Sequence, residues 1–322
     1  MLKLVHSLMS PGGVRGRLSI LIFHRVLAEP DAMLAGEVDR RRFETICGWL
    51  ADWAHVLPLD EAVQRWRTRS LPRRALAITF DDGYADNHDV ALPVLRRFGL
   101  TATFFIATGF LNGGRMWNDV VIEALRGAPD GTLDLGDIVP GMAPVVLQGA
   151  ADRRSTAFAV LRAIKYLEPA QRLAAARAIE ARCGGPSSTR LMMGDAQVRA
   201  LRQAGMQIGA HTVNHPILRV LPREQARREI GDSKAYLADL LREPIGLFAY
   251  PNGKPDTDYG ADAVQLVREL GFDAAVSTAW GAARADSSAW ELPRFSPWDH
   301  REGRYHLRLI DNFRRTPPLA LA

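Results

Sequence analysis

Two neighbouring carboxylates are the first residues of this chain whose types and spacing could do chemistry. Asp81 and Asp82 follow the apolar run Leu-Ala-Ile-Thr-Phe at 76–80 and precede Gly83. A short, nearly continuous apolar run is typical of a buried strand, and a glycine permits a sharp turn after it. We therefore expect both carboxylates at the carboxyl end of a strand, where α/β folds place their chemistry.

A plain turn is the competing interpretation of this Asp-Asp-Gly segment, because aspartate and glycine are common turn residues. Side chains alternate along a strand, so the carboxylates of Asp81 and Asp82 point apart unless the backbone bends. With such an arrangement, one carboxylate could face a metal ion while the other faces a substrate or a water molecule.

A pair of histidines, His211 and His215, follows a short strand-like segment at 207–210. On a helical turn, a spacing of four residues puts both imidazoles on one face, which suits two ligands of one metal ion. An isolated pair of this kind more often has one histidine capping a helix and the other packed in the core. Two histidines and one carboxylate with open positions form a hydrolytic metal site, and Asp82 is the obvious carboxylate.

Strand-like and helix-like segments alternate along the chain, which predicts an α/β barrel rather than a sandwich or a bundle. The expected strands are 18–23, 76–80, 101–107, 207–210, 246–249 and 272–277, and the main expected helices are 39–53, 89–98, 195–204, 223–241 and 261–270. The region 112–194 breaks this rhythm, with an irregular stretch at 130–146 and a strongly helical one at 151–182. We interpret it as a helical insertion into a single catalytic domain that spans residues 1–322.

The composition is that of a globular enzyme, with 47% hydrophobic and 24% charged residues among 322. The net charge of +5 is spread without a long basic run, so nucleic acid is not an expected partner. Cys47 and Cys183 form no Cys-x-x-Cys pattern, which argues against a zinc knot or a disulfide framework. We find neither a secretory signal nor a stretch of about 20 apolar residues, and expect a cytoplasmic, membrane-peripheral protein.

The Thr-Phe-Asp-Asp-Gly segment that ends at Gly83 and the His-Thr-x-x-His segment that begins at His211 resemble two motifs of a known family. These are the first two motifs of the polysaccharide deacetylases, the NodB-homology or carbohydrate esterase family four. The resemblance implies a deformed (β/α) barrel that uses a divalent metal ion to remove acetyl groups from sugars. It also implies that Asp81 is the general base and that Asp82, His211 and His215 are the metal ligands.

Zinc fits ligation by two histidines and one aspartate best, although Co²⁺, Ni²⁺ or Mn²⁺ could occupy such a site. A bound Zn²⁺ would polarise the acetyl carbonyl and acidify a water molecule, whose proton Asp81 would accept. The chemistry that the resemblance implies is therefore consistent with the types of these residues.

The segment Ala-Tyr-Pro-Asn-Gly that begins at Ala249 departs from the family's third motif, Arg-x-Pro-Tyr followed by glycine. Ala249 stands in the position of the arginine that orients the base, and Asn252 stands in that of the tyrosine. The Pro-x-Gly turn remains, so a backbone N–H of Asn252 could still bind the oxyanion, with Tyr250 as a neighbouring candidate for substrate binding. Either Arg294 or Arg25 could supply the missing guanidinium.

The family's general acid is usually a histidine in a Leu-x-His motif near the C-terminal end, and this chain has no such motif. The segment Ile-Phe-His-Arg-Val that includes His24 resembles the Tyr-His element at the start of the poly-N-acetylglucosamine deacetylases. In that branch the motif order is circularly permuted and an N-terminal histidine is the acid. The resemblance therefore implies that His24 is the general acid, against the alternative of a structural hydrogen-bonding role.

These observations together predict a metal-dependent hydrolase of carbon–nitrogen, non-peptide bonds, a carbohydrate de-N-acetylase of exopolysaccharide biosynthesis. The expected partners are an N-acetylated glycan, as a polysaccharide or a lipid-linked precursor, and membrane-associated polysaccharide synthesis machinery. Two alternatives stay open: a hydrolase of small non-sugar amides, and a silent glycan-binding protein, which the departures at Ala249 and Asn252 favour. Trp117, Trp280 and Trp298 could stack on sugar rings, although large aromatic residues are more often buried.

Overall fold

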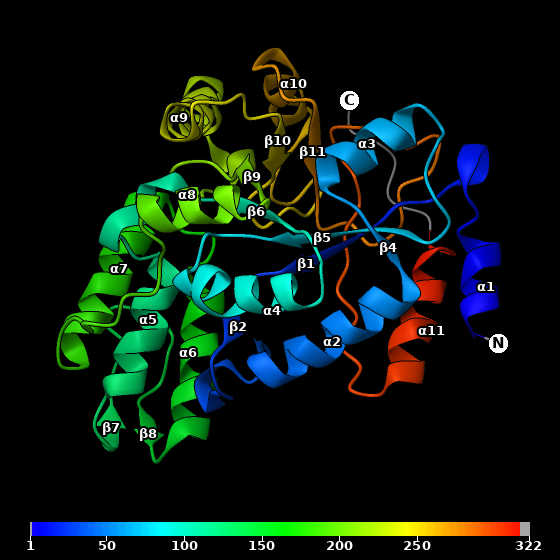
Figure 1. The fold of residues 1–322 in the computed structure, drawn as a ribbon. Helices are drawn as coiled ribbons and strands as arrows, with labels where there is room; N and C mark the ends of the chain where they lie inside the picture. The colour runs from blue at the N-terminus through cyan, green and yellow to red at the C-terminus, as the bar shows by residue number, and fades with distance from the viewer. Residues whose placement is uncertain (1, 316–322) are drawn as a thin grey trace.

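The computed structural model describes residues 2–315, and its centre is a parallel β-sheet that curls into a deformed (β/α) barrel (Figure 1). The strands are β1 Ser19–Phe23, β4 His55–Val56, β5 Ala75–Phe80, β6 Thr103–Ile106, β9 Gln207–Ala210, β10 Leu247–Ala249 and β11 Ala274–Val276. They pair in the order β1-β5-β6-β9-β10-β11, and β4 also pairs with β5. All of these pairs are parallel, so the prediction of an α/β barrel is confirmed.

Residues 292–295, which belong to none of these strands, connect the two edge strands of the sheet. On the β11 side, the backbone N–H of Ser277 donates to the Leu292 carbonyl (2.9 Å). On the β1 side, the N–H of Phe295 donates to the Ile20 carbonyl (3.0 Å). Arg294 lies in this segment, so the closure brings a residue from the far end of the chain into the barrel.

Side chains alternate along the strands and form two hydrophobic clusters, one on each face of the sheet. The first cluster packs against the surrounding helices and includes Leu21, Ile78, Phe104 and Phe248. The second cluster fills the barrel interior and includes Ile20, Ala77, Phe105 and Ala249. Burial on both faces explains why the strands are continuous apolar runs in the sequence.

Helices cover the outside of the barrel (Figure 1). Their bounds are α1 Leu2–Met9, α2 Arg40–Trp53, α3 Leu59–Arg67, α4 Leu92–Arg97, α8 Asp195–Gln203, α9 Arg223–Leu241, α10 Ala261–Glu269 and α11 Glu302–Asn312. A π-helical turn at Asn87–Ala91 precedes α4, where the sequence predicted a regular helix from residue 89. Within residues 2–315, no helix combines the length and the apolar character that crossing a membrane requires.

Three helices and a hairpin form a lobe beside the barrel, away from α1 and α11 (Figure 1). The helices are α5 Trp117–Gly127, α6 Ala150–Ile164 and α7 Pro169–Arg182, and the hairpin pairs β7 Gly131–Leu133 with β8 Val145–Leu147. The stretch expected to be irregular, 130–146, is so only at 134–144, between the two strands of the hairpin. The lobe has its own hydrophobic cluster, which includes Val121, Leu125, Val160 and Ile179. The extent of the insertion, 112–194, stays a prediction.

Candidate active site

Asp81 and Asp82 lie at the carboxyl end of β5, where the backbone N–H of Asp81 donates to the Phe23 carbonyl at the end of β1 (2.9 Å). Alternation along β5 turns Asp81 to the barrel interior and would turn Asp82 outward. Asp82 instead has a φ of 78°, a left-handed conformation that residues other than glycine rarely adopt. This bend lets Asp82 approach the histidines, and such strain, costing about 1–3 kcal/mol, is typical of functional sites.

Arg294 holds the Asp81 carboxylate with two parallel hydrogen bonds. Its Nη1 donates to Oδ1 of Asp81 and its Nη2 donates to Oδ2, both at 2.7 Å. The guanidinium is itself fixed, because Nε donates to the Ser277 carbonyl (2.9 Å) and Nη1 also donates to the Thr79 hydroxyl (3.1 Å). Arg294 is 0% exposed, so this charge pair is out of contact with solvent. Of the two arginines considered, Arg294 therefore reaches Asp81.

Burial alone would raise the pKa of Asp81, because it disfavours the charged form. The charges of Arg294 and His211 and the hydrogen bonds from Arg294 together outweigh burial, and they hold the pKa of Asp81 below its usual value. Asp81 is therefore an ionised carboxylate in a buried place, oriented by a bidentate partner.

Asp82, His211 and His215 converge on one point. Oδ1 of Asp82 lies 3.4 Å from Nε2 of His211 and 3.4 Å from Nε2 of His215. The three potential ligand atoms all lie within 4.8 Å of one another. The structure thus brings together the three residues that the sequence predicted as metal ligands.

The polar atoms of this cluster fit a bound cation. Oδ1 of Asp82 is buried and has no hydrogen-bond partner among the described residues, an arrangement that costs free energy unless something else satisfies it. Nδ1 of His211 donates to the Ala249 carbonyl (2.7 Å), which leaves the lone pair of Nε2 directed at Asp82. Metal-ligating histidines are commonly oriented by such a bond from their other nitrogen.

The two histidines differ in their affinity for protons. Burial lowers the pKa of His215 to about 4, so its imidazole is neutral and able to bind a metal ion at pH 7. Burial also opposes protonation of His211, but the charges of Asp81 and Asp82, together with hydrogen bonding to Asp82 and Ala249, outweigh it and raise the pKa of His211. A cation at this site would therefore compete with a proton for Nε2 of His211.

The loop that carries these histidines is not helical, so the helical-turn explanation of their spacing is wrong. Thr212 and His215 both have left-handed backbone conformations, with φ values of 65° and 50°. The buried Glu229 of α9 stabilises the loop by accepting hydrogen bonds from the backbone N–H groups of Val213 (3.1 Å) and Asn214 (2.8 Å). The same spacing thus brings both imidazoles to Asp82 through a strained loop held from α9.

His24 is exposed at the carboxyl end of β1, and its surroundings fix its backbone. The Asn87 side chain donates to the His24 carbonyl (2.8 Å). Asp86 accepts hydrogen bonds from Arg25 Nε (2.8 Å) and from the Val26 backbone N–H (3.2 Å). Three consecutive residues are thus tethered to the turn that follows the Asp81–Asp82 motif, and Arg25 is occupied by Asp86. The charge of His24 contributes to lowering the pKa of both Asp81 and Asp82.

The turn after β10 separates two residues that the sequence grouped together. Asn252 has a left-handed backbone with a φ of 58°, and its N–H has no hydrogen-bond acceptor within residues 2–315, so it is available to a ligand. Tyr250 is instead a core residue: its ring stacks on Tyr259 and its hydroxyl donates to the Trp290 carbonyl (3.0 Å). The prediction that Tyr250 binds substrate does not fit the placement of its side chain.

Trp280 and Trp298 follow β11 and the closing segment, and their ring centroids lie 5.5 Å apart. They are 41% and 54% exposed, whereas large aromatic residues are more often buried. An arginine covers one face of each ring: the Arg315 guanidinium lies 4.8 Å from the Trp280 centroid, and that of Arg308 lies 3.9 Å from the Trp298 centroid.

A buried polar network joins the helical lobe to this site. The Tyr84 hydroxyl lies 3.2 Å from each carboxylate oxygen of Asp119, and the Arg25 guanidinium lies over the Tyr84 ring, 4.7 Å from its centroid. Burial raises the pKa of Asp119 to about 7, with the charge of Arg25 opposing this and that of Asp82 adding to it. The first turn of α5 therefore holds a carboxyl group that changes its charge near neutral pH.

Replacing Asp119 with asparagine should stabilise the metal-free protein at pH 8 and have much less effect at pH 4.5. In the unfolded chain Asp119 loses its proton near pH 3.8, whereas the folded protein keeps it to about pH 7. Stability is therefore lost as pH rises between these values, and Asp119→Asn removes that loss, a gain of about 1–3 kcal/mol at pH 8. Urea unfolding at the two pH values measures it, with the exposed Asp232→Asn as the control. A gain independent of pH would contradict the explanation.

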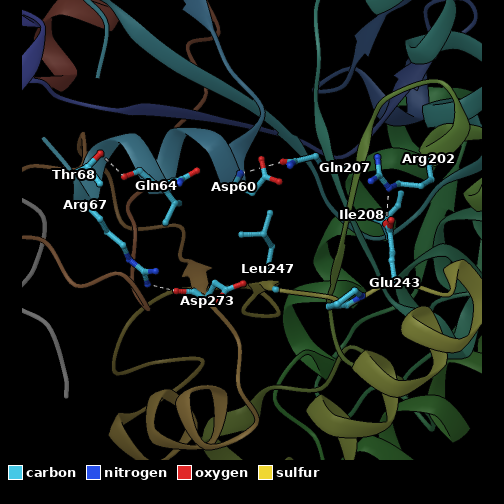
Figure 2. Close-up of a pocket in the computed structure, with 13 residues that line it drawn as sticks. Asp60, Gln64, Arg67, Thr68, Arg202, Gln207, Ile208, Glu243, Leu247 and Asp273 are labelled. Carbon is cyan, nitrogen blue, oxygen red and sulfur yellow. Dashed lines mark hydrogen bonds and ion pairs between the residues drawn. The ribbon is translucent and has the colours of Figure 1, made fainter. Parts of the chain in front are cut away.

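A cavity of about 450 Å³ lies at the other end of the barrel (Figure 2). Many of its labelled lining residues come from α3 and from the amino ends of the strands, such as Asp60, Gln64, Arg67, Gln207, Leu247 and Asp273, while Arg202 comes from α8. None of the candidate site residues lines it. In (β/α) barrels this end serves stability rather than chemistry, so we assign the reaction to the carboxylate end.

More than half of the chain matches a known family. Residues 68–128 and 152–275 match the family described as polysaccharide deacetylase, and the chain belongs to this family. A relative of the chain, YxkH of Bacillus subtilis (strain 168), is named for the same family. It is 20% identical over 280 residues, which are 86% of this chain and 70% of the relative. His24 and Arg294 lie outside the matched ranges, so their placement comes from the structure.

Solved structures share the fold. The deacetylase PplD of Streptococcus pyogenes, in complex with acetate, matches with a TM-score of 0.62 at 19% sequence identity. The match covers 93% of this chain and 99% of the PplD chain. IcaB from Ammonifex degensii has a TM-score of 0.58 at 17% sequence identity, and the match covers 92% of this chain and 98% of the IcaB chain. These likenesses agree with the deformed barrel described above.

Proposed function

We propose that this protein is a metal-dependent hydrolase that removes N-acetyl groups from an amino-sugar polysaccharide or its lipid-linked precursor. The observation that carries the proposal is the buried Asp81 carboxylate, held by two hydrogen bonds from Arg294, directly beside the cluster of Asp82, His211 and His215. Membership of the polysaccharide deacetylase family supports the reaction class. An ionised base next to a potential metal site is what amide hydrolysis by water needs.

Asp81 is the general base in this proposal. Its carboxylate accepts a proton from the attacking water, and Arg294 keeps it ionised and correctly turned while leaving an oxygen lone pair for the water. The arginine that the family's third motif would supply is absent, because Ala249 stands in its position. Arg294 performs the same task from the segment that closes the barrel.

Asp82, His211 and His215 would hold a divalent cation, and Zn²⁺ suits two imidazoles and one carboxylate best. When bound, such an ion polarises an acetyl carbonyl and lowers the pKa of a water molecule. Three protein ligands leave at least one position open for substrate or water, which is typical of catalytic rather than structural zinc.

Two further groups complete the proposed site. The backbone N–H of Asn252 has no protein acceptor and would donate a hydrogen bond to the oxyanion that develops on the acetyl oxygen. His24 would donate a proton to the leaving amine, because a free amide anion is too basic to leave. Its exposure at the mouth of the barrel lets it reach a sugar bound from solvent.

The amino-sugar substrate is the finer part of the proposal. The structural neighbour PplD is a deacetylase in complex with acetate, the product expected of such a reaction. The exposed Trp280 and Trp298 rings supply flat apolar surface of the kind that sugar rings commonly contact. The acetate fits the release of an acetyl group, and the aromatic surface favours a glycan over a small amide.

The test is acetate release from N-acetylglucosamine oligomers by three samples: metal-stripped protein, zinc-reconstituted protein and the His215→Ala variant. We expect the unsubstituted protein to bind one zinc ion per chain and to release acetate only after zinc is added. The His215→Ala variant should neither retain zinc nor release acetate. No release from a protein that has bound zinc would point to another amide substrate. Neither release nor zinc binding would favour the silent glycan-binding alternative.

A further inference from the structure

A second cavity of about 450 Å³ lies between the helical lobe and the loop that carries His215. Asn214 and Pro216, the two neighbours of His215, line it on the barrel side together with Gly109, which follows β6. Trp117 of α5 and several residues of α7 line it on the lobe side. Because β6 and β9 are adjacent and both loops leave their carboxyl ends, this cavity lies next to the candidate metal site.

Three arginines line this cavity, Arg115, Arg172 and Arg177, against a single carboxylate. That carboxylate, Glu229, accepts hydrogen bonds from the backbone N–H groups of the His215 loop and from the Asn214 side chain (2.8 Å), so its charge is already engaged. Arg115 is 3.8 Å from Glu180, and Arg177 is exposed without an ion pair among residues 2–315. The wall of the cavity therefore carries excess positive charge.

Arg172 is the most unusual of the three, because its side chain is 5% exposed. Its Nη1 donates to the Lys165 carbonyl (2.9 Å), and its guanidinium lies over the Trp117 ring, 4.8 Å from the centroid. Among the described residues, no carboxylate accepts a hydrogen bond from it. The charge of Glu168 acts on Arg172, but the Glu168 carboxylate already accepts hydrogen bonds from two N–H groups at the start of α7. A buried cation without a directly bonded anion is costly, and an anion bound in the cavity would offset that cost.

We propose that this cavity binds an anionic group of the substrate, a carboxylate or a phosphate on a unit next to the sugar that loses its acetyl group. The inference rests on the proposed function, since it names the substrate class of the same site. Guanidinium groups match the geometry of both anions. The apolar side chains of Phe110 and Leu173 complete the lining and suit the faces of a sugar ring.

Binding can be measured without turnover, using zinc-loaded protein with the Asp81→Asn substitution. Three probes of equal length are titrated by calorimetry: a neutral N-acetylglucosamine tetramer, the same tetramer with a terminal phosphate, and an alternating glucuronate–N-acetylglucosamine tetramer. We expect at least one acidic probe to bind about ten-fold more tightly than the neutral probe in about 50 mM salt, with less advantage in about 500 mM. The probe that gains identifies the source of the anion.

Arg177→Glu in the same background should remove this advantage, weakening the acidic probe about ten-fold and leaving the neutral one unchanged. Arg162→Glu is the matched control, because Arg162 is exposed on α6 and does not line the cavity. Arg172→Gln, titrated with the same probes, tests whether the buried guanidinium contributes to the affinity for the acidic probe. Equal affinity for neutral and acidic probes, or equal weakening of both by Arg177→Glu, would overturn the inference. Selective binding by a protein that releases no acetate would support this site while refuting the proposed reaction.

Discussion

Asp81→Asn lowers kcat for acetate release by about 10³–10⁴-fold while the protein still binds zinc and substrate. The asparagine amide cannot accept the proton of the attacking water, and no other carboxylate within the described residues lies in the same position beside Arg294. The variant keeps the shape of the side chain, so the loss measures proton transfer rather than packing. Steady-state acetate release, with zinc content determined on the same sample, is the measurement.

Arg294 provides the companion experiment, because removing one partner of a buried charge pair leaves the other uncompensated. We expect Arg294→Met to destabilise the protein by about 3–5 kcal/mol, as broken buried pairs do. The double variant Arg294→Met with Asp81→Asn should recover much of this stability and none of the activity. Urea unfolding of the two single variants and the double variant gives their coupling. Additive losses of stability would show that the two side chains act independently, against the geometry.

The barrel was predictable from the sequence because its central strands are buried on both faces, whereas most of the surrounding helices are buried on one. Runs such as 76–80 and 101–107 are apolar for that reason, and they lie at β5 and β6 in the structure. The hairpin of the helical lobe was missed because Gly131–Leu133 and Val145–Leu147 are short, half-exposed strands. Their pairing depends on the lobe that they join, which a local pattern does not contain.

The site residues that lie in short sequence motifs were predictable, whereas contacts between residues distant in the sequence were not. Asp81, Asp82, His211 and His215 follow strand ends, and their side chains carry the signal. The pairing of Arg294 with Asp81 joins residues 213 positions apart, so the sequence left it open between two arginines.

Supporting residues were harder to recognise than the site residues themselves. Asp86 and Asn87 have the composition of an ordinary turn, yet their side chains hold the backbone of His24 and Val26 and the side chain of Arg25. Glu229 has the appearance of one more charge on a long surface helix, although it stabilises the His215 loop. Tyr250 was misplaced for the opposite reason: it adjoins the motif turn, but alternation after β10 directs its ring into the core.

His24→Ala should lower amide hydrolysis by about 10²–10⁴-fold and reduce the hydrolysis of an aryl acetate by less than about ten-fold. An amine leaves only with a proton, whereas a nitrophenolate leaves without one. The difference between the two substrates therefore isolates the proton donor from the base and the metal site. His24 is exposed, so its loss leaves the core intact.

Asn87→Ala extends this test to the residues that position the acid. It removes the hydrogen bond to the His24 carbonyl and should produce a smaller loss, about ten-fold, with the same preference for the aryl ester. His55→Ala is the matched control, because His55 is an exposed histidine on β4 and its loss should change neither rate. If His24→Ala retained amide hydrolysis with zinc bound, or slowed both substrates equally, another group would have to protonate the leaving amine.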